Sequence, residues 1–336
     1  MSIRTPQWWY RKHAEGAPWW RPVLKPLAAL WLAVNAGKRR KAKPYRASLF
    51  VISVGNLTLG GSGKTPIAAE LLRLLAGHRV CGLSRGYGGA TERPTLVDPD
   101  RHTAKEVGDE PLMLARHGPM MVALDRAEGL KALEHQGFQV VVVDDAHQNL
   151  KIVKDLHILV VDGDTRDGAW PFGDGGICPD GPLREPLNEG LARADIVVLW
   201  MPDTTSRPDP QLLAVFENKR LFVARLAPRM PVEKGAVVGF AGIAKPWKFE
   251  ATLRDAGFDL RAFEAFADHA EIPEGRLHAL AEDAERQGAR LITTEKDWVR
   301  LSPHWRLHVA SLPIAARFDD ESGFLEAVTK ALPPGA

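Results

Sequence analysis

Short apolar runs rich in Val, Ile and Leu alternate with helical segments along most of the chain. Before residue 201, strands are predicted at 49–54, 80–83, 120–124, 140–143, 157–161 and 196–200, and helices at 66–76 and 126–136. The apolar runs contain few polar residues, which is typical of parallel strands buried on both faces. The pattern therefore predicts an α/β fold, a parallel sheet with helices on both sides.

The same alternation resumes after residue 235. Strands are predicted there at 236–240, 260–266 and 290–294, and helices at 246–255 and 274–287. The segment between the two groups, MPDTTSRPDP at 201–210, is rich in Pro and Asp and is the best candidate for a domain boundary. We expect a core domain over 48–210 and a smaller α/β domain over 211–336, with a ligand cleft between the two lobes.

Composition narrows the class of protein. The chain has 336 residues, of which 45% are hydrophobic and 26% charged, values typical of a soluble globular protein long enough for two domains. Its two cysteines, Cys81 and Cys178, form neither a CxxC pair nor a metal-ligand pattern. This usage suits a reducing cytosol and indicates no disulfide framework.

Charge is distributed unevenly along the chain. Residues 1–47 hold eleven basic residues against one acid, whereas the remainder holds 33 basic against 41 acidic residues. The same basic head contains five of the ten tryptophans: Trp8, Trp9, Trp19, Trp20 and Trp31. A basic, aromatic head on an acidic body indicates an anionic partner, usually nucleic acid or anionic lipid.

The apolar run at 27–36 in the head is shorter than the roughly 20 residues that span a bilayer. A short apolar helix with flanking Trp and a cluster at 38–43 of five basic residues is typical of an interfacial membrane anchor. At about 1 kcal/mol per basic residue, the cluster would contribute up to about 5 kcal/mol at an anionic surface. The alternatives are a helix packed on the protein's own core and RNA binding; no nucleic-acid module follows the head, so we expect no nucleic-acid partner.

The sequence VGNLTLGGSGKTP at 54–66 contains the end of a phosphate-binding loop. The pattern GxxxxGK[ST] aligns Gly63, Lys64 and Thr65 with its last three positions, and Thr58 then replaces the first glycine. A strand precedes the loop and a helix follows it, which is the structural context of a P-loop NTPase-like sheet. The candidate nucleotide-binding residues are Thr58, Leu59, Gly60, Gly61, Ser62, Gly63, Lys64 and Thr65.

Two adjacent carboxylates, Asp144 and Asp145, follow the apolar run at 140–143. Acids at the end of a buried strand beside a P-loop are the usual partners of Mg²⁺, together with the loop hydroxyl of Thr65. The alternative is an aspartate that caps the following turn. With the phosphate loop present, we interpret the pair as part of a metal site.

Seven segments together resemble the tetraacyldisaccharide 4′-kinase family. They are VGNLTLGGSGKTP at 54–66, SRGYGG at 84–89, GDEP at 108–111, Asp144-Asp145 with Gln148, GPLREP at 181–186, Asp268-His269 and TEKD at 294–297. The resemblance implies a P-loop kinase core with a smaller lobe, bound peripherally at the cytoplasmic face of the inner membrane of a Gram-negative bacterium. ATP with Mg²⁺ would be the donor, and the acceptor would be the 4′-hydroxyl of an acylated glucosamine disaccharide 1-phosphate; no obligate protein partner is evident.

Carried over to this chain, the resemblance implies catalytic roles for Asp109, His269 and Lys64. An oriented carboxylate can accept the proton of a sugar hydroxyl, and a neighbouring histidine can hold its orientation. Taken alone, Asp109 would be a helix cap and His269 a strand-end histidine. If both act, His269 comes from the second lobe and lobe closure assembles the site.

The resemblance also implies a metal role for Glu185, which serves with Thr65, Asp144 and Asp145. Candidate contacts to the acceptor are Arg85, Tyr87, Arg126 and Gln148. Three of these have a structural alternative, a surface turn for Arg85 and Tyr87 and a solvated helix start for Arg126. Arg184 beside Glu185 equally suits a structural ion pair.

One segment departs from the family pattern. The family reads DDGFQH where this chain reads DDAHQN at 144–149, so that Ala146, His147 and Asn149 replace a glycine, an aromatic residue and a histidine. Both carboxylates and Gln148 remain, and the metal assignment is kept. The replaced positions predict altered contacts to the acceptor.

Two other functions remain consistent with these motifs. A P-loop GTPase switch or metallochaperone would use TEKD at 294–297 as a guanine-reading N/T-K-x-D element. A membrane-tethered scaffold with an inactive loop would hydrolyse and transfer nothing. Phosphate transfer to lipid would indicate the kinase, tight GTP binding without transfer would indicate the switch, and the absence of both hydrolysis and transfer would indicate the scaffold.

Overall fold

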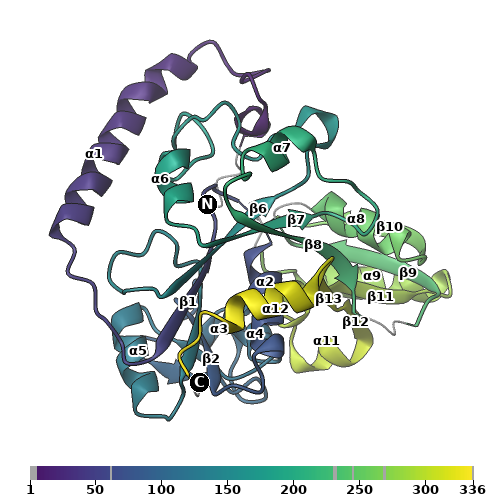
Figure 1. Cartoon of the computed structure of the whole chain (residues 1–336). Coiled ribbons are helices and arrows are strands. Elements are labelled where there is room, and N and C mark those ends of the chain that lie inside the picture. The colour runs from purple at the N-terminus through teal and green to yellow at the C-terminus, as the bar shows by residue number, and fades with distance from the viewer. Residues whose placement is uncertain (1–5, 61–62, 230–232, 244–245, 268–269, 335–336) are drawn as a thin grey trace.

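The computed structural model describes residues 6–60, 63–229, 233–243, 246–267 and 270–334. Within these residues the chain forms two lobes (Figure 1). Nine strands form the sheet of the large lobe and four strands form the sheet of the small lobe. The α/β class predicted from the apolar runs is confirmed.

The predicted strands are present, with small shifts at their ends. In the large lobe the strands are β1 (Phe50–Gly55), β2 (Val80–Ser84), β3 (Thr95–Leu96), β4 (Met120–Val122), β5 (Val140–Asp144), β6 (Leu156–Asp162), β7 (Ile196–Met201), β8 (Arg220–Pro228) and β13 (Ile314–Phe318). In the small lobe they are β9 (Ala236–Ala241), β10 (Asp259–Ala265), β11 (Arg290–Thr294) and β12 (Val309–Leu312).

Helices surround both sheets. In the large lobe they are α1 (Lys25–Lys41), α2 (Lys64–Leu74), α3 (Ala104–Val107), α4 (Asp109–Leu114), α5 (Arg126–Glu134), α6 (Leu187–Ala192), α7 (Pro210–Ala214) and α12 (Glu321–Thr329). In the small lobe they are α8 (Pro246–Asp255), α9 (Glu274–Arg286), α10 (Glu295–Trp298) and α11 (Pro303–His308). Short 3-10 turns occur at Gln7–Tyr10, Arg21–Leu24 and Arg166–Gly168.

The strand order of the large sheet is β13-β8-β7-β6-β1-β5-β2-β4-β3. All neighbours are parallel except the two edge pairs, β13 with β8 and β3 with β4. Strand β1 lies in the middle, between β5 and β6. The carboxyl ends of β1, β2, β5, β6 and β7 therefore meet at one edge, where open α/β sheets bind their ligands.

Alternate residues of the central strands face opposite layers, which explains their continuous apolar composition. Ile52 and Val54 of β1 pack with α2 on one face, whereas Val51 joins the cluster that includes Val141 on the other. A separate cluster lies under α6 and α7, around Leu159. Burial on both faces holds the carboxyl edge of the sheet in a fixed position.

The domain boundary predicted at residue 210 is wrong in position. Strands β8 and β13 and helix α12 lie beyond residue 210 but belong to the large lobe. The chain leaves the large lobe through β8 and returns through β13, and these two strands pair antiparallel. The Pro-rich segment 201–210 is instead a surface loop that ends at α7, where the Asp209 side chain accepts the Gln211 amide. Pro and Asp here mark a helix start rather than a linker.

Helix α1 lies along one side of the large lobe, on the left in Figure 1 and away from the small lobe. Of its residues only Ala28 is buried. The apolar side chains Val23, Leu27, Leu30, Trp31 and Val34 are exposed by 46 to 70%. None of the described helices combines the length and the apolar character needed to cross a membrane.

Candidate active site at the carboxyl edge of the large sheet

The phosphate loop connects β1 to α2, as the sequence predicts. Gly63 caps α2 with a φ of +81°, and a Cβ at this position would lie 2.4 Å from the Trp200 ring. A residue other than glycine is therefore both strained and blocked here. Gly60 also has a positive φ, of +95°. The predicted residues Gly61 and Ser62 lie outside the described residues.

The start of the loop is fixed to the segment 181–186. The amide of Leu59 donates to the carbonyl of Pro182 at 2.8 Å. The carbonyl of Thr58 accepts from Asn56 Nδ2 at 2.8 Å and from Arg184 Nε at 3.1 Å. Thr58 is not among the residues with positive φ. The backbone at this position therefore does not require glycine, which explains why a threonine is tolerated there.

Lys64, Asp144 and Asp145 come together at the carboxyl ends of β1 and β5. Lys64 Nζ lies 3.7 Å from Asp145 Oδ1. Asp144 is buried, and its Oδ1 has no hydrogen-bond partner among the described residues. Burial, aided by the charges of Glu110 and Asp145, raises the pKa of Asp144 to about 7. A buried carboxylate in this state favours either a proton or a metal ion.

Asp145 is held differently from its neighbour. Its φ is +48°, and its carboxylate accepts from Arg184 at 3.0 Å. Burial acts to raise the pKa of Asp145, but Lys64 and Arg184 outweigh burial and place it below the usual range. Asp145 is therefore ionised and connects Lys64 to Arg184.

Glu185 does not have the environment expected of a metal ligand. Its buried carboxylate accepts from Arg193 at 2.6 Å, from Gln148 at 3.0 Å and from Arg39 of α1. Burial acts against ionisation, yet Arg193 holds the pKa of Glu185 below its usual range. Two guanidinium groups compensate this charge, so Glu185 belongs to an ion-pair network in this structure, and its expected metal role stays a prediction.

Arg126 and Gln148, expected at the acceptor, support the acidic strand end instead. Arg126 donates to the carbonyls of Asp144 at 2.9 Å and Asp145 at 3.1 Å, and burial lowers its pKa. Gln148 donates to the carbonyl of Asn56 at 2.7 Å and to Glu185. Both side chains are thus used within the fold.

The departure from the family pattern at 144–149 also has a structural role. Ala146 and His147 are buried, and His147 Nε2 lies 3.1 Å from the carbonyl of Gly190. Burial lowers the pKa of His147 to about 4, so the ring is neutral. A Cβ on Gly55 would lie 2.5 Å from the His147 side chain. The ring fills space between β1 and α6.

Two glycine-rich loops form the wall beside this edge. A Cβ on Gly108 would lie 2.8 Å from the carbonyl of Tyr87, and one on Gly89 would lie 2.7 Å from the backbone of Gly108. The glycines of SRGYGG and GDEP therefore let the two backbones meet. Arg85 and Tyr87 are left exposed at the surface, Tyr87 by 75%.

Asp109 is the first residue of α4 and is buried. Its Oδ1 accepts from the amide of Glu110 at 2.9 Å. Lys296 from the small lobe lies 4.0 Å from Asp109 Oδ2 and 3.6 Å from Glu110 Oε1. The charge of Glu110 contributes to the raised pKa of Asp144, so the start of α4 faces the same side of the sheet as the acidic strand end. His269, its expected partner, lies outside the described residues.

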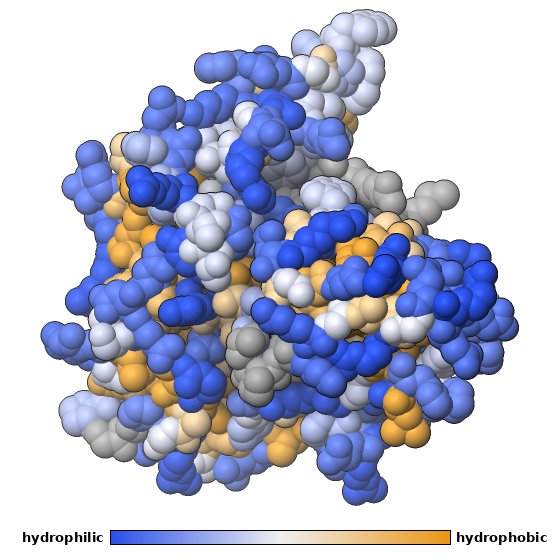
Figure 2. All heavy atoms as spheres, turned by 90° about the vertical axis from the view of Figure 1, so that its right-hand side faces the viewer, coloured by the Kyte–Doolittle hydropathy of each residue, from blue (hydrophilic) through white to orange (hydrophobic). Residues whose placement is uncertain are grey.

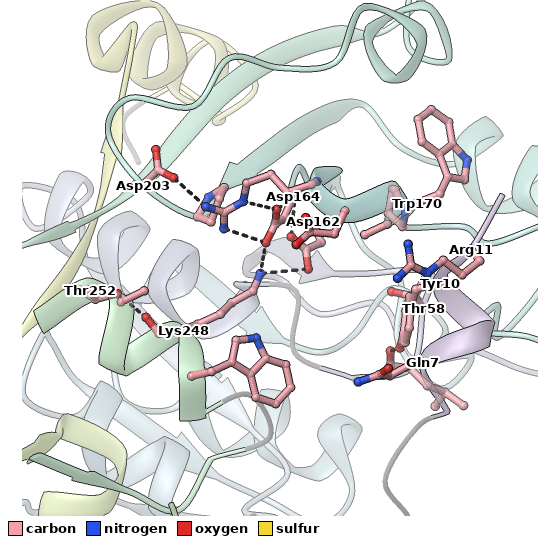
Figure 3. Close-up of a pocket in the computed structure, with 18 of the residues that line it drawn as sticks. Gln7, Tyr10, Arg11, Thr58, Asp162, Asp164, Trp170, Asp203, Lys248 and Thr252 are labelled. Atoms are coloured by element: carbon pink, nitrogen blue, oxygen red, sulfur yellow. Dashed lines mark hydrogen bonds and ion pairs between the residues drawn. The ribbon is translucent and has the colours of Figure 1, made fainter. Parts of the chain in front are cut away.

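A polar cleft of about 640 Å³ opens beside the start of the phosphate loop (Figure 3). Thr58 and Leu59, the ends of β6 and β7, the N-terminal segment and α8 line it. Lys248 of α8 bridges to Asp162 at 3.7 Å and to Asp164 at 2.9 Å across the cleft. Trp247 is exposed by 57%. The cleft therefore lies between the lobes.

Sequence reasoning missed Lys248, Trp247 and Lys296 as residues at this edge. Lys296 lies within the TEKD motif, which the sequence does show. The motif does not predict, however, that Lys296 contacts Asp109 and Glu110 of the other lobe. Lys248 and Trp247 follow no motif. Their positions depend on how the small lobe sits on the large one.

The guanine-reading role considered for TEKD does not fit. Asp297 is buried and accepts from the Gly242 amide at 2.9 Å, from Thr294 at 2.7 Å and from Arg300 at 3.2 Å. It follows β11 of the small sheet, not a strand beside β1. A carboxylate with these partners has no capacity to read a base.

Comparisons with known proteins agree on one family. A family profile described as Tetraacyldisaccharide-1-P 4′-kinase matches residues 20–333. The chain is 50% identical over 334 residues to the Tetraacyldisaccharide 4′-kinase of Caulobacter vibrioides (strain NA1000 / CB15N), covering 99% of each protein. It is 48% identical over 332 residues to that of Phenylobacterium zucineum (strain HLK1), covering 99% of this chain and 100% of the relative.

A solved structure with the same architecture is the "apo" form of LpxK from Aquifex aeolicus in complex with ATP. The match has a TM-score of 0.70 and 27% identity, and it covers 93% of this chain and 99% of that chain.

Proposed function

The chain belongs to the tetraacyldisaccharide-1-P 4′-kinase family, and from this premise we propose that it transfers the terminal phosphoryl group of ATP to the 4′-hydroxyl of a tetraacyl glucosamine disaccharide 1-phosphate. The product would be lipid IVA, an intermediate of lipid A biosynthesis. The observation that carries this proposal is the meeting of Lys64, Asp144 and the start of α4 at one edge of the sheet.

The donor would bind along the carboxyl edge. Backbone amides of the phosphate loop and Lys64 would hold the phosphates, since loop amides before a helix start bind anions. Open α/β sheets bind ligands outside the carboxyl ends of their strands, which here include β6 and β7. The cleft lined by Thr58 and Leu59 is in that direction, and Trp247 offers a ring for stacking.

The donor set also fits Mg²⁺. Thr65 begins the first turn of α2, and Asp144 presents a buried carboxylate oxygen without a hydrogen-bond partner among the described residues. Those residues contain no group of three or more His, Cys, Asp or Glu side chains able to hold a metal. This suits Mg²⁺, which takes one or two protein ligands and completes its shell with phosphate and water. When bound, it would neutralise charge on the transferring phosphoryl group.

Asp109 would act as the general base. A sugar hydroxyl is a weak nucleophile, and a fixed carboxylate can take its proton as the new O–P bond forms. The Glu110 amide fixes one oxygen of Asp109. Arg85 and Tyr87, exposed on the neighbouring glycine-rich loop, would contact the acceptor's head group.

Helix α1 would dock the enzyme on an anionic membrane where the acceptor resides. Its exposed apolar stripe at positions 27, 30 and 34 continues into the exposed Lys38 and Lys41, with spacings that place them on one face of a helix. Figure 2, from the small-lobe side, shows a mainly hydrophilic surface with separate hydrophobic patches. We propose peripheral binding at the cytoplasmic face of the inner membrane.

Product mass tests the proposed reaction. The enzyme is incubated with labelled ATP, Mg²⁺ and the acylated disaccharide 1-phosphate, and the lipid is analysed by mass spectrometry. We expect one added phosphate at the 4′-position, lost in Lys64→Ala. ATP consumption without a phosphorylated lipid would reject the acceptor, and binding of GTP in preference to ATP would reject the donor.

A further inference from the structure

Helix α10 of the small lobe packs against α4 of the large lobe, beside the carboxyl edge. Three of the four residues in TEKD fix this short helix in place. Thr294 accepts the amide of Asp297 at 3.0 Å and caps the helix. Glu295 accepts the amide of Ile314 at 3.1 Å, and Asp297 accepts the amide of Gly242 at 2.9 Å. The helix is therefore held both by a residue that precedes it in the chain, Gly242, and by one that follows it, Ile314.

The fourth residue, Lys296, points out of this anchored helix into the large lobe. Its Nζ lies 3.6 Å from Glu110 Oε1 and 4.0 Å from Asp109 Oδ2. The Asp109 side chain is 7% exposed and that of Lys296 is 21% exposed. Because both groups are largely removed from water, their attraction is screened less than that of a surface pair.

Negative charge accumulates at this corner. Asp109 and Glu110 are consecutive, and the charge of Glu110 also reaches Asp144. A nearby cation favours the ionised form of a carboxyl group, and only an ionised Asp109 can accept a proton from the acceptor. Lys296 supplies such a cation to both carboxylates.

We propose that Lys296 is a positioning residue that holds Asp109 ionised and oriented for catalysis, and that it does so only when the small lobe is seated against the large lobe. The inference rests on the proposed role of Asp109 as general base. It assigns a function to TEKD, whose other three residues then serve to present one lysine across the junction between the lobes. Closure of the small lobe on the large lobe would thereby also bring Asp109 into the ionised state that catalysis needs.

A second lysine–glutamate pair across the junction provides the matched control. Lys105 lies 3.0 Å from Glu271, with side chains that are 84% and 82% exposed. This pair also joins α3 of the large lobe to the small lobe, but it is solvated and does not face Asp109. Loss of a solvated pair has little effect.

The test compares Lys296→Met, Lys296→Arg and Lys105→Met in the full-length enzyme, with labelled ATP and the acylated disaccharide 1-phosphate in mixed micelles. In Lys296→Met we expect the acid limb of the pH–rate profile to move up by about one pH unit, the low end for removing a neighbouring charge, so that kcat falls about tenfold at pH values below this limb. The KM for ATP should change less than about twofold. Lys296→Arg should restore most of the rate, and Lys105→Met should match the wild type.

An acid limb of Lys296→Met that coincides with the wild type would overturn the inference. So would a fall in rate and melting temperature that Lys296→Arg shares in full, because packing and not charge would then be responsible. Asp109→Asn, measured alongside, separates this inference from the proposed function: full activity in Asp109→Asn rejects the base itself. An inactive Asp109→Asn with an unmoved profile in Lys296→Met rejects only the role of Lys296.

Discussion

The acidic edge at β5 and the helix α1 depart from ordinary burial in opposite ways. At β5 a carboxylate, Asp144, is buried with a pKa raised to about 7. On α1 apolar side chains such as Leu27 and Leu30 are exposed by 52% and 61%. Stable folds normally bury apolar groups and expose or pair charges. We propose that each exception reflects something that binds there, a cation at β5 and a lipid surface at α1.

The two regions also differ in how they are held. The acidic edge is fixed by the central strands and by Arg126 and Arg184. Helix α1 is held mainly through polar contacts, including Trp31 Nε1 to the Arg184 carbonyl at 3.1 Å and Arg39 to Glu189 at 2.5 Å. Chemistry needs fixed groups, whereas docking on a fluid surface needs an accessible face.

Asp144→Asn should give the largest effect and tests the buried charge directly. We expect kcat to fall by at least about 10³-fold because the metal loses its carboxylate ligand. The folded pKa of Asp144, about 7, lies above its ordinary value of 3.8, so this group destabilises the fold progressively as pH rises between these values. The variant should therefore be more stable at pH 8 without Mg²⁺, by on the order of 1–3 kcal/mol.

Denaturant unfolding at pH 8 and pH 5 in metal-free buffer measures this prediction. The gain should shrink at pH 5, where the wild-type carboxyl is already protonated. An Asp144→Asn protein that is less stable than the wild type at pH 8 would show that the carboxylate has a structural partner instead of a cation.

The double variant Leu27→Ser/Leu30→Ser tests the exposed apolar face. Partial burial of each leucine in a membrane should contribute about 1 kcal/mol, so partition into anionic vesicles should fall about 30-fold. Sedimentation with vesicles measures it. The control is Leu307→Ser on α11, since Leu307 is 85% exposed on the small lobe. Equal partition of the double variant and the control would remove α1 as the docking surface.

The Mg²⁺ requirement should depend on pH in a defined direction. Only the ionised carboxylate binds a cation, and burial raises the pKa of Asp144 to about 7. Below that pH, the Mg²⁺ concentration for half-maximal binding should rise about tenfold per pH unit, and above about pH 8 it should level off. Titration of Mg²⁺ with ATP bound, followed by Trp fluorescence between pH 5.5 and 8.5, would reveal this slope; a flat response contradicts the assignment.

Tyr10→Phe should give the smallest effect and probes a link between the two regions. The Tyr10 hydroxyl donates to the carbonyl of Leu59 in the phosphate loop. Losing one such hydrogen bond corresponds to about 1 kcal/mol, so we expect the Kd for ATP to rise about threefold to sixfold. Calorimetry measures it, with Tyr45→Phe as the control because Tyr45 contacts Glu134 away from the loop. An unchanged Kd would mean that the N-terminal segment does not support the loop.

Local sequence determined the elements and part of the site. Unbroken apolar runs predicted the central strands because both faces of a parallel sheet are buried, and the spacing around Gly63, Lys64 and Thr65 placed the loop before a helix. Asp144 and Asp145 directly follow the apolar run at 140–143, so the sequence also predicted a charged end for this strand. These features depend on neighbours in sequence, which a single chain displays directly.

Only the tertiary structure decided where the lobes divide and which polar groups are used internally. β8 and β13 meet across about 90 residues of intervening chain, a pairing that no local pattern reports. Glu185, Gln148 and Arg126 matched a motif for ligand contact, but ion pairing and hydrogen bonding from distant segments use these groups within the fold. Lys296 gained its place at Asp109 only because two lobes are packed together. A motif identifies the chemical type of a side chain, whereas its partner depends on long-range packing.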